Sequence, residues 1–216
     1  AFHKLIMTST TYRQSSVHRP EQDKVDIHNQ LYGRFPLRRL EAESIRDSIL
    51  KVNKSLDTTL YGPPVPLKED TAGVMHYPPE FPRKTIYMQV RRHKPSAFLL
   101  TFDGPGLSPN CDKRTRSAGT PQALALMNSD FIRAESSKLA SLLLQNQAND
   151  TKTLIIQAWK TVYQRLPNTN EITLAMTFLS ESQATYTATK SKEPRQMAWT
   201  DLCQQLLASN EFIYLE

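Results

Sequence analysis

The spacing of apolar side chains predicts one clear helix in the first half of the chain. Its inward positions follow one another at steps of three and four residues: Ala42, Ile45, Ile49, Val52 and Leu56. That spacing places them on one face of an α-helix. The remaining face carries charged residues, which we interpret as exposed to solvent: Glu43, Arg46, Asp47, Lys51 and Lys54.

Helix start signals divide the chain after residue 119 into several further helices. The expected caps are Thr120 with Pro121 at the first helical position, Ser129 or Asp130, Asp150, and Asn168 in a capping box with Glu171. The last helix presents an apolar stripe of Trp199, Leu202, Cys203, Leu206 and Leu207, after a predicted polar loop over Thr187–Arg195. Helices joined by short loops favour antiparallel neighbours, so we predict an antiparallel helical bundle.

The middle of the chain carries a different pattern. Prolines cluster between Pro63 and Pro95, which predicts a long irregular segment. Residues 84–92 alternate apolar and polar positions with the period of a half-buried strand, and a second apolar run follows over 96–106. We therefore predict a small hairpin or a pair of extended strands here. The opening residues to about Thr10 are expected to be helical, and the stretch from there to Pro36 irregular.

These elements together predict a mainly α protein. We expect a single helix-rich domain over residues 1–216, with a helix and an extended region in 1–119 and the bundle in 120–216. The first residues read as the middle of an element, which indicates a fragment of a larger multidomain protein.

Composition and charge narrow the function classes. The apolar fraction of 39% is that of a folded chain, and 27 Lys and Arg against 21 Asp and Glu give a modest net charge of +6. We expect no nucleic-acid partner from so small a bias. No apolar run is long enough for a membrane span, and no Gly-rich phosphate loop is present.

A basic segment is the most tangible candidate for binding. The candidate residues for contact with an anion or a partner are Arg91, Arg92, Lys94, Lys113, Arg114 and Arg116. One interpretation is that they form an exposed patch that binds an acidic protein or an anionic polysaccharide. Alternatively, the arginines turn inward onto backbone carbonyls and the carboxylates of Glu41, Glu43 or Asp103.

The cysteines and histidines give little support for catalysis or metal binding. Cys111 lies beside three cations, a setting that suits an activated thiol with His93 or His76 as base, but a structural hinge is the favoured interpretation. Cys111 and Cys203 either form a disulfide or stay separate as packed thiols. The five histidines are scattered, so no metal site is expected. Glu41 and Glu43, two residues apart, are expected to point to different faces of a helix.

Five segments in order along the chain carry a family resemblance. They are HKLIMTSTTYRQSS, NQLYGRFPLRRLEAESIRDSIL, RKTIYMQVRR, FDGPGLSPNCDKRTRSAGTPQALALMNSDF and WTDLCQQLLASNEFIYLE. Together they resemble DUF1553, a C-terminal domain of unknown function found in large secreted proteins of planctomycete-type bacteria. The chain departs from that pattern at Gly33, where a bulky aromatic is expected, and at Lys54, where glycine is common.

The resemblance implies a parent protein that is exported to the periplasm or the cell exterior. Such parents carry upstream domains, commonly a cytochrome-c-like haem module, whereas this chain has no Cys-x-x-Cys-His motif to attach haem and is expected to hold no cofactor. We therefore expect a non-catalytic interaction or assembly domain, whose partners are other domains of the parent or an acidic protein. The alternative is an enzyme or binding domain that acts on a sulfated or carboxylated polysaccharide.

Overall fold

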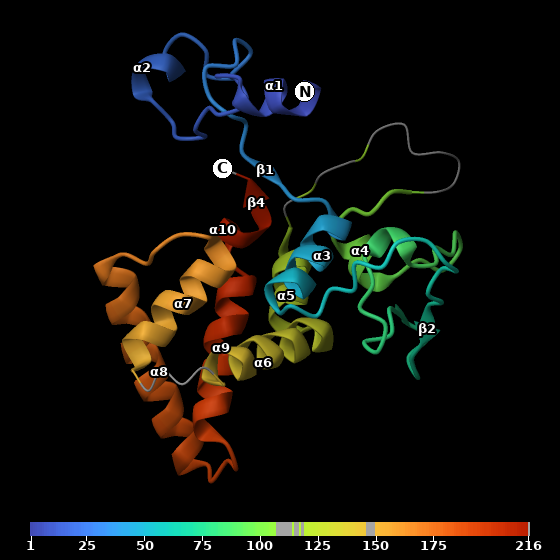
Figure 1. The fold of residues 1–216 in the computed structure, drawn as a ribbon, viewed down its shortest axis with the longest axis vertical. Coiled ribbons are helices and arrows are strands. Elements are labelled where there is room, and N and C mark those ends of the chain that lie inside the picture. The colour runs from blue at the N-terminus through green and yellow to red at the C-terminus, as the bar shows by residue number, and fades with distance from the viewer. Residues whose placement is uncertain (107–113, 115–116, 118, 146–149, 216) are drawn as a thin grey trace. The chain divides into compact units, whose positions relative to one another are not determined.

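The computed structural model describes residues 1–106, 114, 117, 119–145 and 150–215 (Figure 1). Two compact units are distinguished. The first consists of Ala1–Leu40 with Ile213–Glu216, and the second of Glu41–Phe212. The described residues are mainly α-helical, as predicted, and their two sheets have two short strands each. The assignment of one domain to the whole chain stays a prediction.

The first unit holds little regular structure. It contains α1 (Phe2–Thr8), α2 (Pro20–Asp23) and β1 (Arg38–Arg39), which pairs antiparallel with β4 (Tyr214–Leu215). The predicted opening helix is present, and the stretch expected to be irregular contains the four-residue α2. Of residues 1–40, only Arg39 is buried, and the described residues of this unit bury one apolar side chain, that of Ile213.

Helix α3 (Ala42–Val52) begins the second unit and confirms the predicted helix, although it ends four residues before Leu56. Ala42, Ile45 and Ile49 are buried, as their spacing requires. The interpretation of the charged face as fully solvated is wrong at Arg46, whose exposure is 4%. The guanidinium has partners inside the fold, which is how a buried charge can be tolerated.

The backbone at the end of α3 accounts for the expectation of glycine at position 54. The amide of Ser55 donates to the Leu50 carbonyl at 3.0 Å, and the amide of Lys54 donates to the Lys51 carbonyl at 3.0 Å. These two bonds form a Schellman motif, whose C′ residue must be left-handed. Lys54 fills that position with φ 56°, a conformation that favours glycine.

We therefore expect Lys54→Gly to stabilise the protein by about 1 kcal/mol, because glycine removes the steric cost of the left-handed conformation. Urea denaturation measures the change in the free energy of unfolding. Lys54→Ala is the matched control, since it removes the same exposed side chain and keeps the steric cost. Equal effects of glycine and alanine would refute the explanation.

The prediction of extended strands over 84–92 and 96–106 is wrong. The first segment contains the short 3₁₀-helix η1 (Thr85–Tyr87) and single bridges to residues 57 and 65, and the second contains α4 (Ala97–Thr101). A hairpin does occur nearby, between β2 (Lys68–Glu69) and β3 (Met75–His76). Of the alternating apolar residues, Met88 is buried and Ile86 is exposed. Among the described residues, no strand pairs with this segment to form a sheet.

Most of the remaining described residues are helical. The helices are α5 (Thr120–Asn128), α6 (Asp130–Leu144), α7 (Thr151–Tyr163), α8 (Thr169–Ala188), α9 (Pro194–Leu207) and α10 (Asn210–Ile213). Helix α9 packs against α6 and α8, and α8 packs against α7 (Figure 1). The predicted stripe of α9 is buried, including Trp199 and Cys203.

Two of the predicted caps are confirmed and two details are corrected. Asp150 accepts hydrogen bonds from the amides of Lys152 and Thr153, and Asn168 forms the predicted capping box with Glu171. Helix α5 is preceded by Gly119, so Thr120 already lies within the helix and does not cap it. The polar loop is shorter than predicted, because α8 continues to Ala188 and α9 begins at Pro194.

A buried carboxylate joins α3 to α6. Glu135 on α6 accepts a hydrogen bond from the side-chain amide of Asn53 at 2.8 Å, and Lys138 pairs with its other oxygen at 2.7 Å. Asn53 is the C-cap of α3. The contact therefore fixes the C-terminal end of α3 against the helices that follow.

Candidate functional site

A pocket of about 380 Å³ lies beside α3 in the second unit. Helices α3 and α4 and the segment 77–90 supply most of its lining. Buried Met88 and Leu99 provide apolar surface, and three exposed apolar side chains also line it: Ile86, Val90 and Leu100. Polar groups are contributed by Glu41, Glu43, Ser44, Asp47, Tyr77, Thr85, Ser96 and Arg114. A mostly apolar concavity with a few polar groups is typical of a binding site.

Arg114 closes one side of this pocket through two carboxylates. Its Nη1 and Nη2 atoms donate to the two oxygens of Glu43 at 2.7 and 2.9 Å, and Nη1 also lies 3.0 Å from Glu41. Burial is the largest influence on the pKa of the Glu43 carboxyl and would raise it, but the hydrogen bonds from Arg114, a backbone hydrogen bond and the charge of Arg114 together hold the pKa below its ordinary value. The bidentate geometry is the one for which a guanidinium is best suited.

The expectation that Glu41 and Glu43 point apart is wrong. It assumed that both residues are helical, whereas Glu41 is the N-cap of α3 and has an extended backbone with φ −71° and ψ 152°. Its side chain can therefore turn to the same guanidinium as Glu43. The sequence signal that could have found this arrangement is the position of Glu41 directly before the first inward residue, Ala42.

A second arginine supports the pocket from inside the fold. Nη1 of Arg46 donates to the Arg83 carbonyl at 2.9 Å and to the Thr85 hydroxyl at 3.1 Å. Its guanidinium lies 5.1 Å from the centre of the Tyr77 ring, within cation–π range. The Thr85 amide and hydroxyl donate to Asp47 at 2.9 and 2.6 Å. These contacts fix η1 against α3 and so position the pocket lining.

The protonation of the lining groups favours binding over acid–base catalysis. A catalytic acid needs a raised carboxyl pKa, whereas that of Glu43 is lowered and Asp47 accepts from Thr85 through both oxygens. Burial raises the pKa of the Tyr77 hydroxyl to about 12, so it is a neutral donor at physiological pH. The described lining contains no histidine or cysteine.

The described cysteine and histidines that were weighed for thiol chemistry lie in different surroundings. His76 lies 2.8 Å from Asp70 on the β2–β3 hairpin, and His93 is exposed. Cys203 is fully buried on α9, and burial raises the pKa of its thiol. Cys111 lies outside the described residues, so the disulfide and the activated thiol stay predictions. Among the residues described, no group of His, Cys, Asp and Glu could hold a metal ion.

The described residues of the basic segment differ in their surroundings. Arg114 turns inward to Glu41 and Glu43, which agrees with the second of the two interpretations. Lys94 is exposed and pairs with Glu69. Arg91 and Arg92 are exposed. Lys113 and Arg116 lie outside the described residues, so the patch of six cations stays a prediction.

We expect Arg114→Ala to lower the free energy of unfolding by about 2 kcal/mol, because it strands two carboxylates beside an apolar pocket. Retention on a column of sulfated polysaccharide should stay unchanged, since the Arg114 charge is already paired. The control is the double variant Arg91→Ala and Arg92→Ala, which removes exposed cations and should leave melting unchanged. Lost retention with unchanged melting for Arg114→Ala would show that this residue belongs to a binding patch.

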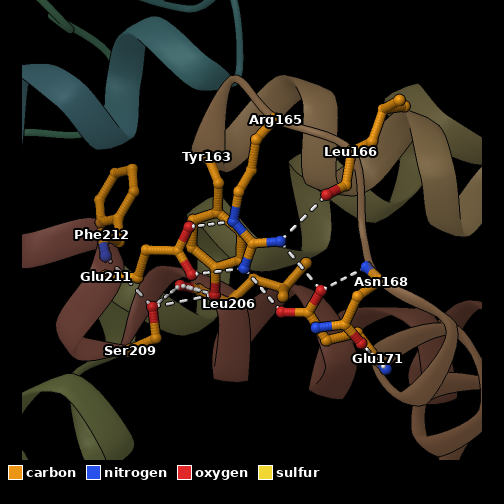
Figure 2. A network of polar contacts seen from close by, with 9 residues as sticks. All are labelled: Tyr163, Arg165, Leu166, Asn168, Glu171, Leu206, Ser209, Glu211 and Phe212. Carbon is orange, nitrogen blue, oxygen red and sulfur yellow. Dashed lines mark hydrogen bonds and ion pairs between the residues drawn. The ribbon is translucent and has the colours of Figure 1, made fainter.

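A second polar cluster lies between the end of α7, the start of α8 and α10 (Figure 2). Arg165 donates to both oxygens of Glu171 at 2.9 and 2.6 Å and to both oxygens of Glu211 at 2.6 and 2.7 Å. Nη1 also donates to the Leu166 carbonyl at 3.0 Å. Below the guanidinium, the Tyr163 hydroxyl donates to Ser209 at 2.9 Å. With these partners Arg165 joins three helices, and we interpret the cluster as structural.

The model of the family described as "PSD1: Protein of unknown function (DUF1553)" matches residues 1–179, and the last resembling segment, 199–216, lies outside this match. No curated protein and no solved structure matches the chain. No helix in the described part of the chain is long and apolar enough to cross a membrane. The match covers most of the sequence and confirms the resemblance, so the chain belongs to the DUF1553 family of proteins of unknown function.

Proposed function

We propose that this chain is a non-catalytic interaction or assembly domain of an exported, haem-associated multidomain protein. In this proposal the C-terminal helices form an antiparallel bundle that supports the pocket beside α3. The observation that carries the proposal is the character of the pocket. Its apolar surface extends outward to Ile86, which is 82% exposed, while Glu43 and Asp47 are already engaged by Arg114 and Thr85. Such a surface suits contact with another protein better than turnover.

The alternative of an anionic polysaccharide is disfavoured at this pocket. Glu41, Glu43 and Asp47 line it, and Arg114 is the one cation among the described lining residues. A sulfated or carboxylated chain would meet like charge there, which is destabilising. Arg91 and Arg92 are the exposed cations to which such a polymer would have to bind instead.

Site-specific photo-crosslinking tests the proposal. A photoreactive amino acid replaces Ile86 of this chain within the full-length parent, in the cells that produce it. We expect it to yield an adduct with a defined protein segment. Position 160 on α7 is the matched control, because Lys160 is also exposed and does not line the pocket. Fractionation and haem staining of the same cells test export and haem association.

Equal adducts at positions 86 and 160 would argue against an interaction surface at the pocket. The enzyme alternative would be established by two results together. The protein would have to release reducing ends from a sulfated polysaccharide, and Asp47→Asn would have to abolish that activity.

A further inference from the structure

Two hydroxyl groups line the pocket without a hydrogen-bond partner among the described residues. Ser96, at the N-cap of α4, is only 3% exposed, and its side chain makes no capping bond. Tyr77 is half-buried, and its hydroxyl makes no hydrogen bond within the described part of the chain. Neither hydroxyl is among the fully buried side-chain atoms that lack a partner, so both are open to the pocket. They can therefore donate to a polar group that enters the pocket from outside the chain.

The two carboxylates at the edge of the pocket, Glu41 and Glu43, differ in how fully Arg114 pairs with them. Arg114 engages both oxygens of Glu43, whereas Glu41 contacts it through one oxygen, and the Glu41 side chain is 46% exposed. An ionised carboxylate can accept about four hydrogen bonds, so Glu41 has acceptors to spare. Of the three carboxylates in the described lining, Glu43 is engaged by Arg114 and Asp47 lies 3.5 Å from Arg46, which leaves Glu41 the least fully paired. The geometry is complementary to a cation beside an apolar group.

We propose that the pocket binds a segment of a partner protein in which a large apolar side chain lies next to a lysine or arginine. The apolar side chain contacts Met88 and Leu99, and the cation pairs with Glu41. The hydroxyls of Tyr77 and Ser96 bind main-chain carbonyls of the same segment, since a neutral phenol and a serine both donate. This inference rests on the proposed function and names the chemistry of the partner.

The pocket volume sets the size of the probe. A space of about 380 Å³ is at the lower end of the range for ligand sites, which suits one aromatic ring with a short polar arm. Three probes share this shape and differ in charge at pH 7: phenethylamine is cationic, 2-phenylethanol is neutral and 3-phenylpropionate is anionic. A comparison of the three separates the contribution of charge from that of apolar contact.

Methyl NMR of the intact chain measures the binding of each probe. We expect the methyl signals of Met88 and Leu100 to shift on titration, and that of Met176, which does not line the pocket, to stay unchanged. Phenethylamine should bind about fivefold more tightly than 2-phenylethanol, the gain expected for one partly exposed ion pair, and 3-phenylpropionate should bind most weakly. Glu41→Gln should abolish the preference of phenethylamine over 2-phenylethanol.

Glu69→Gln is the matched control, because Glu69 is an exposed carboxylate outside the pocket lining and its loss should leave the order of affinities unchanged. Absence of a shift at Met88 with all three probes, equal affinities, or tightest binding of 3-phenylpropionate would each overturn the inference. The crosslinking experiment at position 86 is independent of the probe. Suppose that adducts form at position 86 but phenethylamine binds no more tightly than 2-phenylethanol. The chain would then still be an interaction domain, but the proposed chemistry of its partner would be wrong.

Discussion

Replacement of Arg46 with alanine is expected to lower the free energy of unfolding by about 3–5 kcal/mol, the range observed when one partner of a buried ionic group is removed. The guanidinium is 4% exposed, and its Nη1 donates to the Arg83 carbonyl and the Thr85 hydroxyl. Truncation would strand the Arg83 carbonyl inside the fold and leave a cavity beside Tyr77 and Phe131, which both lie within 6.0 Å of Cζ. Urea denaturation followed by circular dichroism measures the loss.

Two further variants of α3 make the Arg46 result specific. Arg46→Lys keeps the charge but not the planar guanidinium, so we expect it to recover only part of the stability. Lys51→Ala removes a cation from the exposed side of the same helix and should change stability by less than about 0.5 kcal/mol. A loss of about 1 kcal/mol or less for Arg46→Ala would contradict the view that Arg46 holds η1 against α3.

The elements that could be predicted from sequence are those governed by local signals. Helix α3 follows from the spacing of its inward residues, and the starts of α7 and α8 follow from Asp150 and from the Asn168–Glu171 pair. In each case the deciding contacts lie within one or two helical turns. A neighbouring element can strengthen such contacts, but their location is already set by the residues themselves.

The structure of the middle of the second unit could not be predicted from local sequence, because it depends on contacts with residues far away in the chain. The alternation around Met88 is that of a strand, yet Val65 forms only a single bridge with Met88, and the Thr85 amide and hydroxyl are bound by Asp47 of α3. Strand propensity describes how side chains fit a pleated surface, so it has no effect where no such surface forms. The second run became α4, which begins directly after Pro95 at its N-cap, Ser96.

The candidate site was partly predictable. The pairing of Arg114 with Glu41 and Glu43 was one of two outcomes proposed from sequence, because a planar guanidinium suits carboxylates and carbonyls. The burial of Arg46 and Ser96 carries no such signal, since both types are usually exposed. Arg165 was missed for a related reason: its second partner, Glu211, lies 46 residues away in the sequence.

The stability of the Arg165 cluster should depend on pH. The hydrogen bond from Arg165 lowers the pKa of Glu171 from 4.5 to about 2. An unfolded chain binds this proton more readily than the folded one, so the stabilisation is complete above pH 5 and is lost as the pH falls toward 2. Because the Glu171 side chain is 25% exposed, solvent screens the pair, and we expect this dependence to contribute about 1–2 kcal/mol.

Arg165→Ala is expected to cost about 2–3 kcal/mol at pH 7, because Glu171 and Glu211 lose their shared cation and then repel each other across the end of α7. The cost should shrink at pH 3, since protonated carboxyls no longer repel and the native protein has by then lost part of the same stabilisation. Urea midpoints of both proteins at pH 7 and pH 3 measure the difference. Glu181→Gln, on the exposed side of α8, is the matched control and should change neither value. An Arg165→Ala cost that is equal at the two pH values would show that Arg165 acts through packing on Tyr163, 5.5 Å from its Cζ, and not through its charge.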